Sequence, residues 1–171
     1  MRIAPITPGT RPELAELEAT ITRQRGRVSP LYQVLLNSPA MAHGWEQMLT
    51  AVRRHNSLPD LDRELLIVRV AVLNHARFEY EAHVPIALQA GASSQMIADV
   101  SGADAIGASV QGGLRALVEL ADAMTSRIDV PDALYAQAAA YYTQQQMVDA
   151  MVTIGAYNMV SRFLEAVQIG H

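Results

Sequence analysis

The fold of this chain is decided by residues 58–91, which read LPDLDRELLIVRVAVLNHARFEYEAHVPIALQAG. The segment from Leu61 to Asn74 is apolar on nearly every side. It starts after Pro-Asp and has no partner strand, so it predicts a helix that is buried all round. A turn near residues 75–77 is expected to lead into a second helix that ends at Gly91, a glycine suited to a C-terminal cap. Pro85 would kink this second helix or begin a later one.

Helix start and stop signals recur along the rest of the chain, whereas strand alternation with paired turns is scarce. The last helix is apolar on more than one face, which is typical of an element that contacts both its own core and a partner subunit. The sequence therefore predicts one all-α domain over residues 1–171 that self-associates. Further helices are expected from Pro12 toward Gly26, after Ser29-Pro30, from Ser38-Pro39 to His55, from Ser93 to Val100, from Leu114 to Thr125, from Pro131 to Tyr142, and after Thr143.

Composition excludes several kinds of chemistry. The chain has no cysteine, which excludes thiol catalysis and thiolate metal sites. All 13 basic residues are arginine, so Schiff-base catalysis and a P-loop lysine are excluded as well. The net charge of −4 without a basic stripe argues against nucleic acid as a partner. No stretch is apolar enough for a signal peptide or a membrane span, so we expect a cytoplasmic protein.

A candidate site lies in the same stretch. Glu79 and His83 are four residues apart, so on a helix they share one face. Glu64 lies on the preceding helix and would approach His83 if the two helices pack antiparallel. A carboxylate beside a buried imidazole raises the pKa of the imidazole, and a second carboxyl group in a dry environment is shifted toward neutrality. The three groups would then form a general acid and base, although Glu-x-x-x-His is also a common accident and Glu64 could be a solvated charge.

This stretch resembles the carboxymuconolactone decarboxylase family, which includes the alkylhydroperoxidase D-like (AhpD-like) proteins. The resemblance rests on Leu-Pro before Arg63-Glu64, on the apolar helix ending at Leu73-Asn74, and on His83 followed by an apolar turn to Gly91. Weaker agreement extends to Ser38-Pro39 and to residues 157–163. It implies a multi-helix AhpD-like fold assembled into homotrimers or homohexamers, with sites near subunit contacts.

Redox members of that family carry Cys-x-x-Cys before the histidine and use a glutamate of the previous helix with that histidine as a proton relay. Aligned on His83, the two cysteines correspond to Ala76 and Glu79, and the relay glutamate corresponds to Glu64. Without either thiol, we expect no disulfide-based peroxidase activity. The resemblance instead indicates a cysteine-free branch that works by acid–base chemistry.

The leading hypothesis is a carboxymuconolactone decarboxylase-like enzyme without metal or organic cofactor. It would act as a decarboxylase, lyase, isomerase or hydrolase on a small lactone-like or carbonyl-containing acid. His83 would be the acid–base group, Glu64 its orienting partner and Glu79 a second acid–base group. Arg77 or Arg69 could hold a substrate carboxylate, and Tyr80 could donate a hydrogen bond, although salt bridges and packing are equally open for these residues.

Two alternatives stay open. Glu64, Glu79 and His83, with His75, could bind a divalent metal ion, although their spacing matches no zinc signature. The chain could also be an oligomeric scaffold or small-molecule binder that kept the fold without the chemistry.

Overall fold

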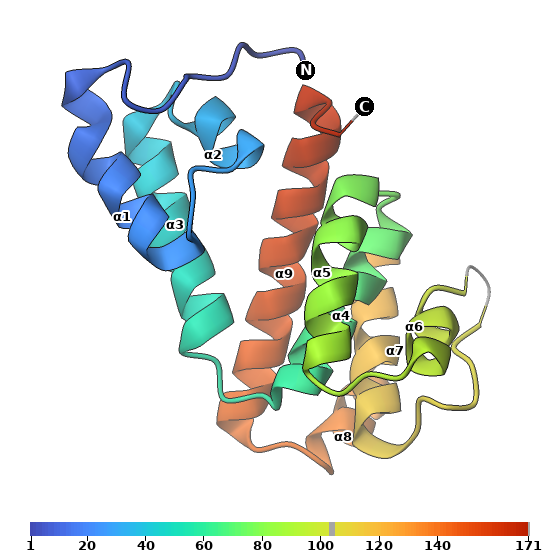
Figure 1. The fold of residues 1–171 in the computed structure, drawn as a ribbon. Helices are drawn as coiled ribbons and strands as arrows, with labels where there is room; N and C mark the ends of the chain where they lie inside the picture. The colour runs from blue at the N-terminus through green and yellow to red at the C-terminus, as the bar shows by residue number, and fades with distance from the viewer. Residues whose placement is uncertain (103–104, 171) are drawn as a thin grey trace. The chain divides into compact units, whose positions relative to one another are not determined.

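The computed structural model describes residues 1–102 and 105–170, and within these ranges the regular structure is helical (Figure 1). The all-α prediction is confirmed. The elements are η1 (Pro12–Leu14), α1 (Ala15–Arg25), α2 (Pro30–Leu35), α3 (Pro39–Arg54), α4 (Asp60–Leu73), α5 (Arg77–Gln89), α6 (Ser94–Val100), α7 (Gly112–Ser126), α8 (Asp132–Ala139) and α9 (Gln144–Val167).

The chain divides into two compact units. The first comprises Met1–His55 with the C-terminal residues from Ala166 onward, and the second comprises Asn56–Glu165. One domain over residues 1–171 stays a prediction. No helix within the described residues is long and apolar enough to cross a membrane.

A buried polar cluster holds the first unit together. The carboxylate of Glu46 on α3 accepts hydrogen bonds from the Tyr32 hydroxyl at 2.5 Å, from Arg25 Nε at 3.0 Å and from the Thr50 hydroxyl at 2.6 Å. These bonds join α1 and α2 to α3. Because every polar atom of the Glu46 carboxylate finds a donor, the charge is compensated in the core.

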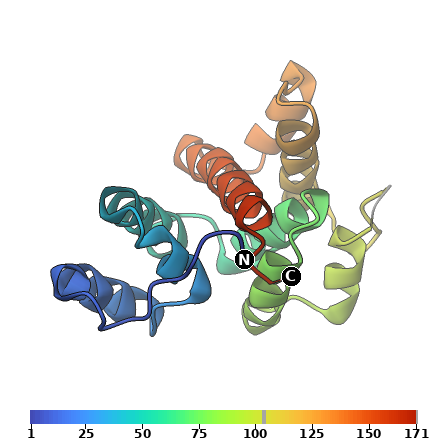
Figure 2. The same ribbon diagram turned by 90° about the horizontal axis from the view of Figure 1, so that it is seen from above.

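The second unit is built on the pair α4 and α5, which lie side by side in two perpendicular views (Figure 1, Figure 2). Residues 63–71 of α4 are all buried, as the apolar run predicted. Helices α6 and α7 pack on α4, and α8 packs on α7. Helix α9 joins the same unit through side-chain bonds from Asn158 to Asn74 of the α4–α5 turn and to Thr125 of α7.

Several helix ends follow the signals in the sequence. The Ser93 hydroxyl accepts a hydrogen bond from the Met96 N–H and caps α6. Thr143 and Gln146 form the reciprocal bonds of a capping box before α9. Gly91 follows α5 with φ of 104°, a conformation that favours glycine. Pro85 lies inside α5, so the alternative that it begins a later helix is wrong.

Arg69 is the main polar anchor between α4 and its neighbours. Its side chain is 3% exposed, and its guanidinium donates to both carboxylate oxygens of Asp122 on α7, at 2.6 and 3.0 Å. It also donates to the carbonyl oxygens of Val100 and Gly102, which follow α6. These bonds tie three segments of the second unit to one side chain.

Replacing Arg69 by Met is therefore expected to lower the free energy of unfolding by about 3–5 kcal/mol, because Asp122 and two carbonyls lose their common donor. Chemical denaturation of parent and variant measures the change. Arg77→Met is the matched control, since Arg77 is 82% exposed and pairs only along its own helix with Glu81. An Arg69 variant as stable as the Arg77 variant would contradict this role.

Candidate active site

The turn between α4 and α5 sets the antiparallel arrangement of the two helices. Residues 74–76 separate them, and His75 adopts a left-handed conformation with φ of 56°. The His75 N–H donates to the Val72 carbonyl at 3.0 Å, and the Ala76 N–H donates to the Ala71 carbonyl at 2.9 Å. These bonds reverse the chain within three residues. Glu64 and His83, 19 positions apart in the sequence, are thereby brought into contact.

Glu64 and His83 form a buried hydrogen bond. The distance from Glu64 Oε2 to His83 Nδ1 is 2.8 Å, and the two residues are 1% and 6% exposed. The other carboxylate oxygen, Oε1, lies 3.3 Å from Arg63 Nη2. Arg63 also pairs with Asp60 at 2.8 Å, so its guanidinium is held between two acids. The carboxylate of Glu64 therefore bridges a guanidinium and an imidazole, a contact with Arg63 that the sequence analysis missed.

Glu79 lies one turn before His83 on α5 and is 2% exposed. Its Oε2 accepts a hydrogen bond from the Ser161 hydroxyl at 2.9 Å, whereas Oε1 is buried without a hydrogen-bond partner. Burial raises the pKa of Glu79 to about 8, although the bond from Ser161 acts in the opposite direction. At neutral pH this carboxyl group is mostly protonated, which makes it a proton donor.

Helix α9 supports both acid–base residues of α5. The ring of Tyr157 meets the His83 ring edge-on, with centroids 5.0 Å apart and an interplanar angle of 88°. One turn later, Ser161 binds Glu79. The spacing of four between Tyr157 and Ser161 thus matches the spacing between Glu79 and His83, as expected for antiparallel helices in contact. The sequence analysis gave neither residue a role at the site, because their spacing within α9 does not indicate which helix they meet.

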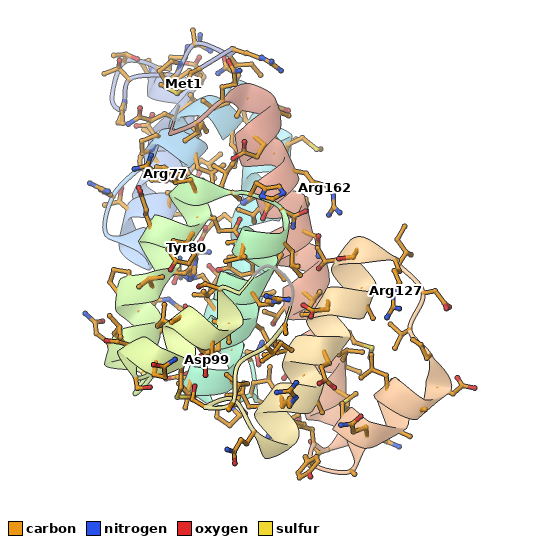
Figure 3. The ribbon with its side chains drawn as sticks, turned by 90° about the vertical axis from the view of Figure 1, so that its right-hand side faces the viewer. Met1, Arg77, Tyr80, Asp99, Arg127 and Arg162 are labelled. Atoms are coloured by element: carbon orange, nitrogen blue, oxygen red, sulfur yellow. The ribbon has the colours of Figure 1, made fainter. Side chains whose placement is uncertain are left out.

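A cavity of about 360 Å³ opens beside this cluster. Two of the three residues predicted to bind substrate, Arg77 and Tyr80, line it, and both lie near the start of α5 (Figure 3). The third, Arg69, is absent from its lining and is committed to Asp122. Ala76, which corresponds to the first cysteine of the redox members, is also part of the wall. The full lining comprises Ala71, Val72, His75, Ala76, Arg77, Tyr80 and Ser101.

The structure does not assemble a metal-binding cluster from the predicted alternative. Within the described parts of the chain, no group of three histidine, aspartate or glutamate side chains is placed to hold one ion. His75 is exposed and lines the cavity, whereas Glu64 and His83 are buried against each other. We therefore assign no residues to a metal.

Residues 39–123 match the model of the carboxymuconolactone decarboxylase family. The matched segment contains Glu64, Glu79, His83 and the whole cavity lining. The chain belongs to the carboxymuconolactone decarboxylase family. Comparison with curated proteins gives no match.

Solved structures share the fold of this carboxymuconolactone decarboxylase family member. An alkylhydroperoxidase AhpD core protein from Ralstonia eutropha JMP134 is 15% identical with a TM-score of 0.81, over 96% of this chain and 88% of that one. An uncharacterized peroxidase-related protein from Silicibacter sp. TM1040 is 17% identical with a TM-score of 0.80, over 96% and 87%. The debrominase Bmp8, in complex with 2,3,4-tribromopyrrole, is 12% identical with a TM-score of 0.79, over 98% and 90%. The predicted AhpD-like fold is confirmed.

The raised pKa of Glu79 predicts how stability depends on pH. Between the unfolded value of 4.5 and the folded value of about 8, the native protein keeps a proton that the unfolded chain releases. The free energy of unfolding therefore falls as pH rises through this window, by up to roughly 1 kcal/mol per pH unit. Glu79→Gln removes this titration, so its stability relative to the parent should increase from about pH 5 to pH 8 and then level off.

Denaturation curves at a series of pH values measure this difference. Glu81→Gln is the control, because Glu81 lies on the same helix with its side chain 58% exposed. Stability curves for Glu79→Gln and the parent that stay parallel across the window would show that Glu79 titrates normally.

Proposed function

We propose that this protein is a cofactor-independent acid–base enzyme of the cytoplasm, acting as a decarboxylase or related lyase, isomerase or hydrolase on a small lactone-like or carbonyl-containing acid. The observation that carries the proposal is the buried hydrogen bond of 2.8 Å between Glu64 and His83. Glu79 lies one helical turn away with an unpartnered carboxyl oxygen. Buried titratable groups arranged in this way are typical of catalytic sites.

His83 is the proposed proton-transfer group. Its Nδ1 faces the Glu64 carboxylate, which places the Nδ1 proton in that hydrogen bond and leaves proton exchange with substrate to Nε2. Glu64 then orients the ring and stabilises the imidazolium that forms when Nε2 accepts a proton. Edge-on packing of Tyr157 restricts rotation of the same ring. The imidazole is thus held in one orientation by a hydrogen bond and by an aromatic contact.

Glu79 is the proposed acid. As a neutral carboxylic acid at pH 7, it can donate a hydrogen bond to an oxygen on which negative charge develops. In a decarboxylation, the C–C bond to the substrate carboxylate breaks and CO₂ leaves. The electron pair moves to the neighbouring carbonyl and generates an enolate. His83 then delivers a proton to carbon, so the charge lost with CO₂ is balanced by one proton.

The structural neighbours support a small-molecule enzyme of this fold, since the debrominase structure holds 2,3,4-tribromopyrrole. Thiol chemistry is not part of the proposal. The chain lacks cysteine, so the disulfide exchange of an alkylhydroperoxidase has no sulfur here. Glu79 stands at the position of a redox cysteine and supplies a carboxyl group instead.

Turnover across lactones, β-keto acids and 2-oxo acids tests the mechanism. For an accepted substrate, His83→Gln and Glu79→Gln are each expected to lower kcat by about 10²–10⁴, the usual contribution of a positioned acid or base. Glu64→Gln should lower kcat less, because it keeps a hydrogen bond to the ring while removing the charge. His43→Gln is the matched control, since His43 is exposed on α3 in the first unit.

The pH profile separates the two acid–base roles. Activity of the parent should fall above about pH 8 as Glu79 loses its proton, and this decline should be absent from the residual activity of Glu79→Gln. Parental kcat in both the His83 and the Glu79 variants would overturn the mechanism.

We also propose that the chain self-associates as a homotrimer or homohexamer, as its family resemblance implies. The large apolar side chains Val148, Val152 and Met159 are exposed along α9 at spacings of four and seven, which places them on one face of that helix. Light scattering coupled to size-exclusion chromatography measures the mass. A monomer at micromolar concentration would refute this assembly.

A further inference from the structure

We propose that the cavity beside the α4–α5 turn binds the carboxylate group of a small acid with an apolar body, and that His75 is a ligand-orienting residue of this site. This inference rests on the proposed function, because it identifies the substrate class of the same site. It adds His75 and Ser101 to the residues expected from the sequence.

The polar part of the lining is suited to an anion. Arg77 supplies a permanent cation, and the hydroxyl oxygens of Tyr80 and Ser101 lie 3.3 Å apart. Of the described residues that line the cavity, none is acidic. The carboxylate that faces Arg77 is Glu81, at 2.7 Å in a solvent-exposed pair. Such exposed pairs hold their partners weakly, so Arg77 can exchange Glu81 for a bound carboxylate.

The start of α5 adds to the same preference. Ala76, at the N-cap of this 13-residue helix, has no side-chain group that could accept hydrogen bonds from the first turn. Negative charge is favoured at a helix N-terminus, where N–H groups lack intrahelical partners. Ala76 and Arg77 both line the cavity.

His75 holds a conformation that its side chain disfavours. A φ of 56° is costly for a residue with a Cβ atom, and glycine would adopt it freely. The backbone here is determined by the turn that joins α4 to α5, yet the position carries an imidazole that lines the cavity. Strained residues of this kind concentrate where a side chain serves a ligand.

The remaining wall is apolar and close to the proposed acid–base groups. Ala71, Val72 and Ala76 supply small hydrocarbon surfaces, and 360 Å³ is in the range of small-molecule sites. Tyr80 is three residues before His83 and one after Glu79, so the cavity wall and the proposed catalytic residues belong to adjacent turns of α5. A ring or short chain against the alanines would carry its carboxylate toward Arg77.

Binding of benzoate, compared with its uncharged isostere benzamide, tests the inference on the full-length protein. An NMR titration of the ¹⁵N-labelled chain yields both the affinity and the residues affected. Benzoate should bind saturably and shift the amide signals of the cavity lining. Benzamide should bind about tenfold more weakly, the effect of losing a hydrogen bond to a charged group.

Three variants examine the residues. Arg77→Gln, Tyr80→Phe and His75→Gly should each weaken benzoate binding by about three- to tenfold, whereas Arg127→Gln should not. Arg127 is an exposed arginine that lies far from Arg77 in the same unit (Figure 3). His75→Gly should also raise Tm or leave it unchanged, because it releases the left-handed strain. Loss of binding without loss of stability distinguishes a ligand contact from a structural role.

The outcomes separate this inference from the proposed function. Equal affinity for benzoate and benzamide, no saturable binding, or variants that bind like Arg127→Gln would overturn the cavity assignment. None of these results depends on turnover. Conversely, His83→Gln should bind benzoate like the parent, since His83 is not in the lining. If it does so and also keeps full turnover, the acid–base mechanism fails while the binding site stands.

Discussion

The hydrogen bond between Glu64 and His83 is the interaction on which the arrangement of the second unit depends. An acid with 1% exposure is tolerated only when its charge is compensated, and here the compensation comes from His83 and Arg63. The bond requires α4 and α5 to be antiparallel at contact distance, which in turn requires the tight turn at His75. One polar contact therefore links the helix register, the strained turn and the proposed chemistry.

Helix α9 gives this pair a dry environment without closing off its function. Tyr157 covers the edge of the imidazole, and Ser161 satisfies one oxygen of Glu79. The second oxygen of Glu79 is left buried and unpaired, a state that is costly in a core and more understandable in a site that receives a substrate. The two carboxyl groups thus differ in environment: Glu64 has cationic partners, and Glu79 has a hydroxyl and apolar surroundings.

Much of the site could be predicted before the fold was known, because it depends on local spacing. Glu79 and His83 share a helix face through the period of the helix, and the buried run of α4 placed Glu64 on the neighbouring element. Arg69 shows the limit of such reasoning. Its charge suggested a carboxylate ligand, but its partners are Asp122 and two carbonyls, 31–53 residues away in the chain. Similarly, Tyr157 and Ser161 carry no local mark that joins them to α5.

The sequence by itself determined the helices, the absence of thiol and lysine chemistry, and the acid–base set of Glu64, Glu79 and His83. Period and residue type are properties of short segments, so they can be read without tertiary contacts. Only the tertiary structure decided which arginine is committed to an ion pair, which carboxyl oxygen is left unpaired, and where a cavity opens. These properties depend on burial, and burial is set by segments that are distant in the chain. The buried bond between Glu64 and His83 needed both: helix patterns to supply its residues, and the turn at His75 to bring them together.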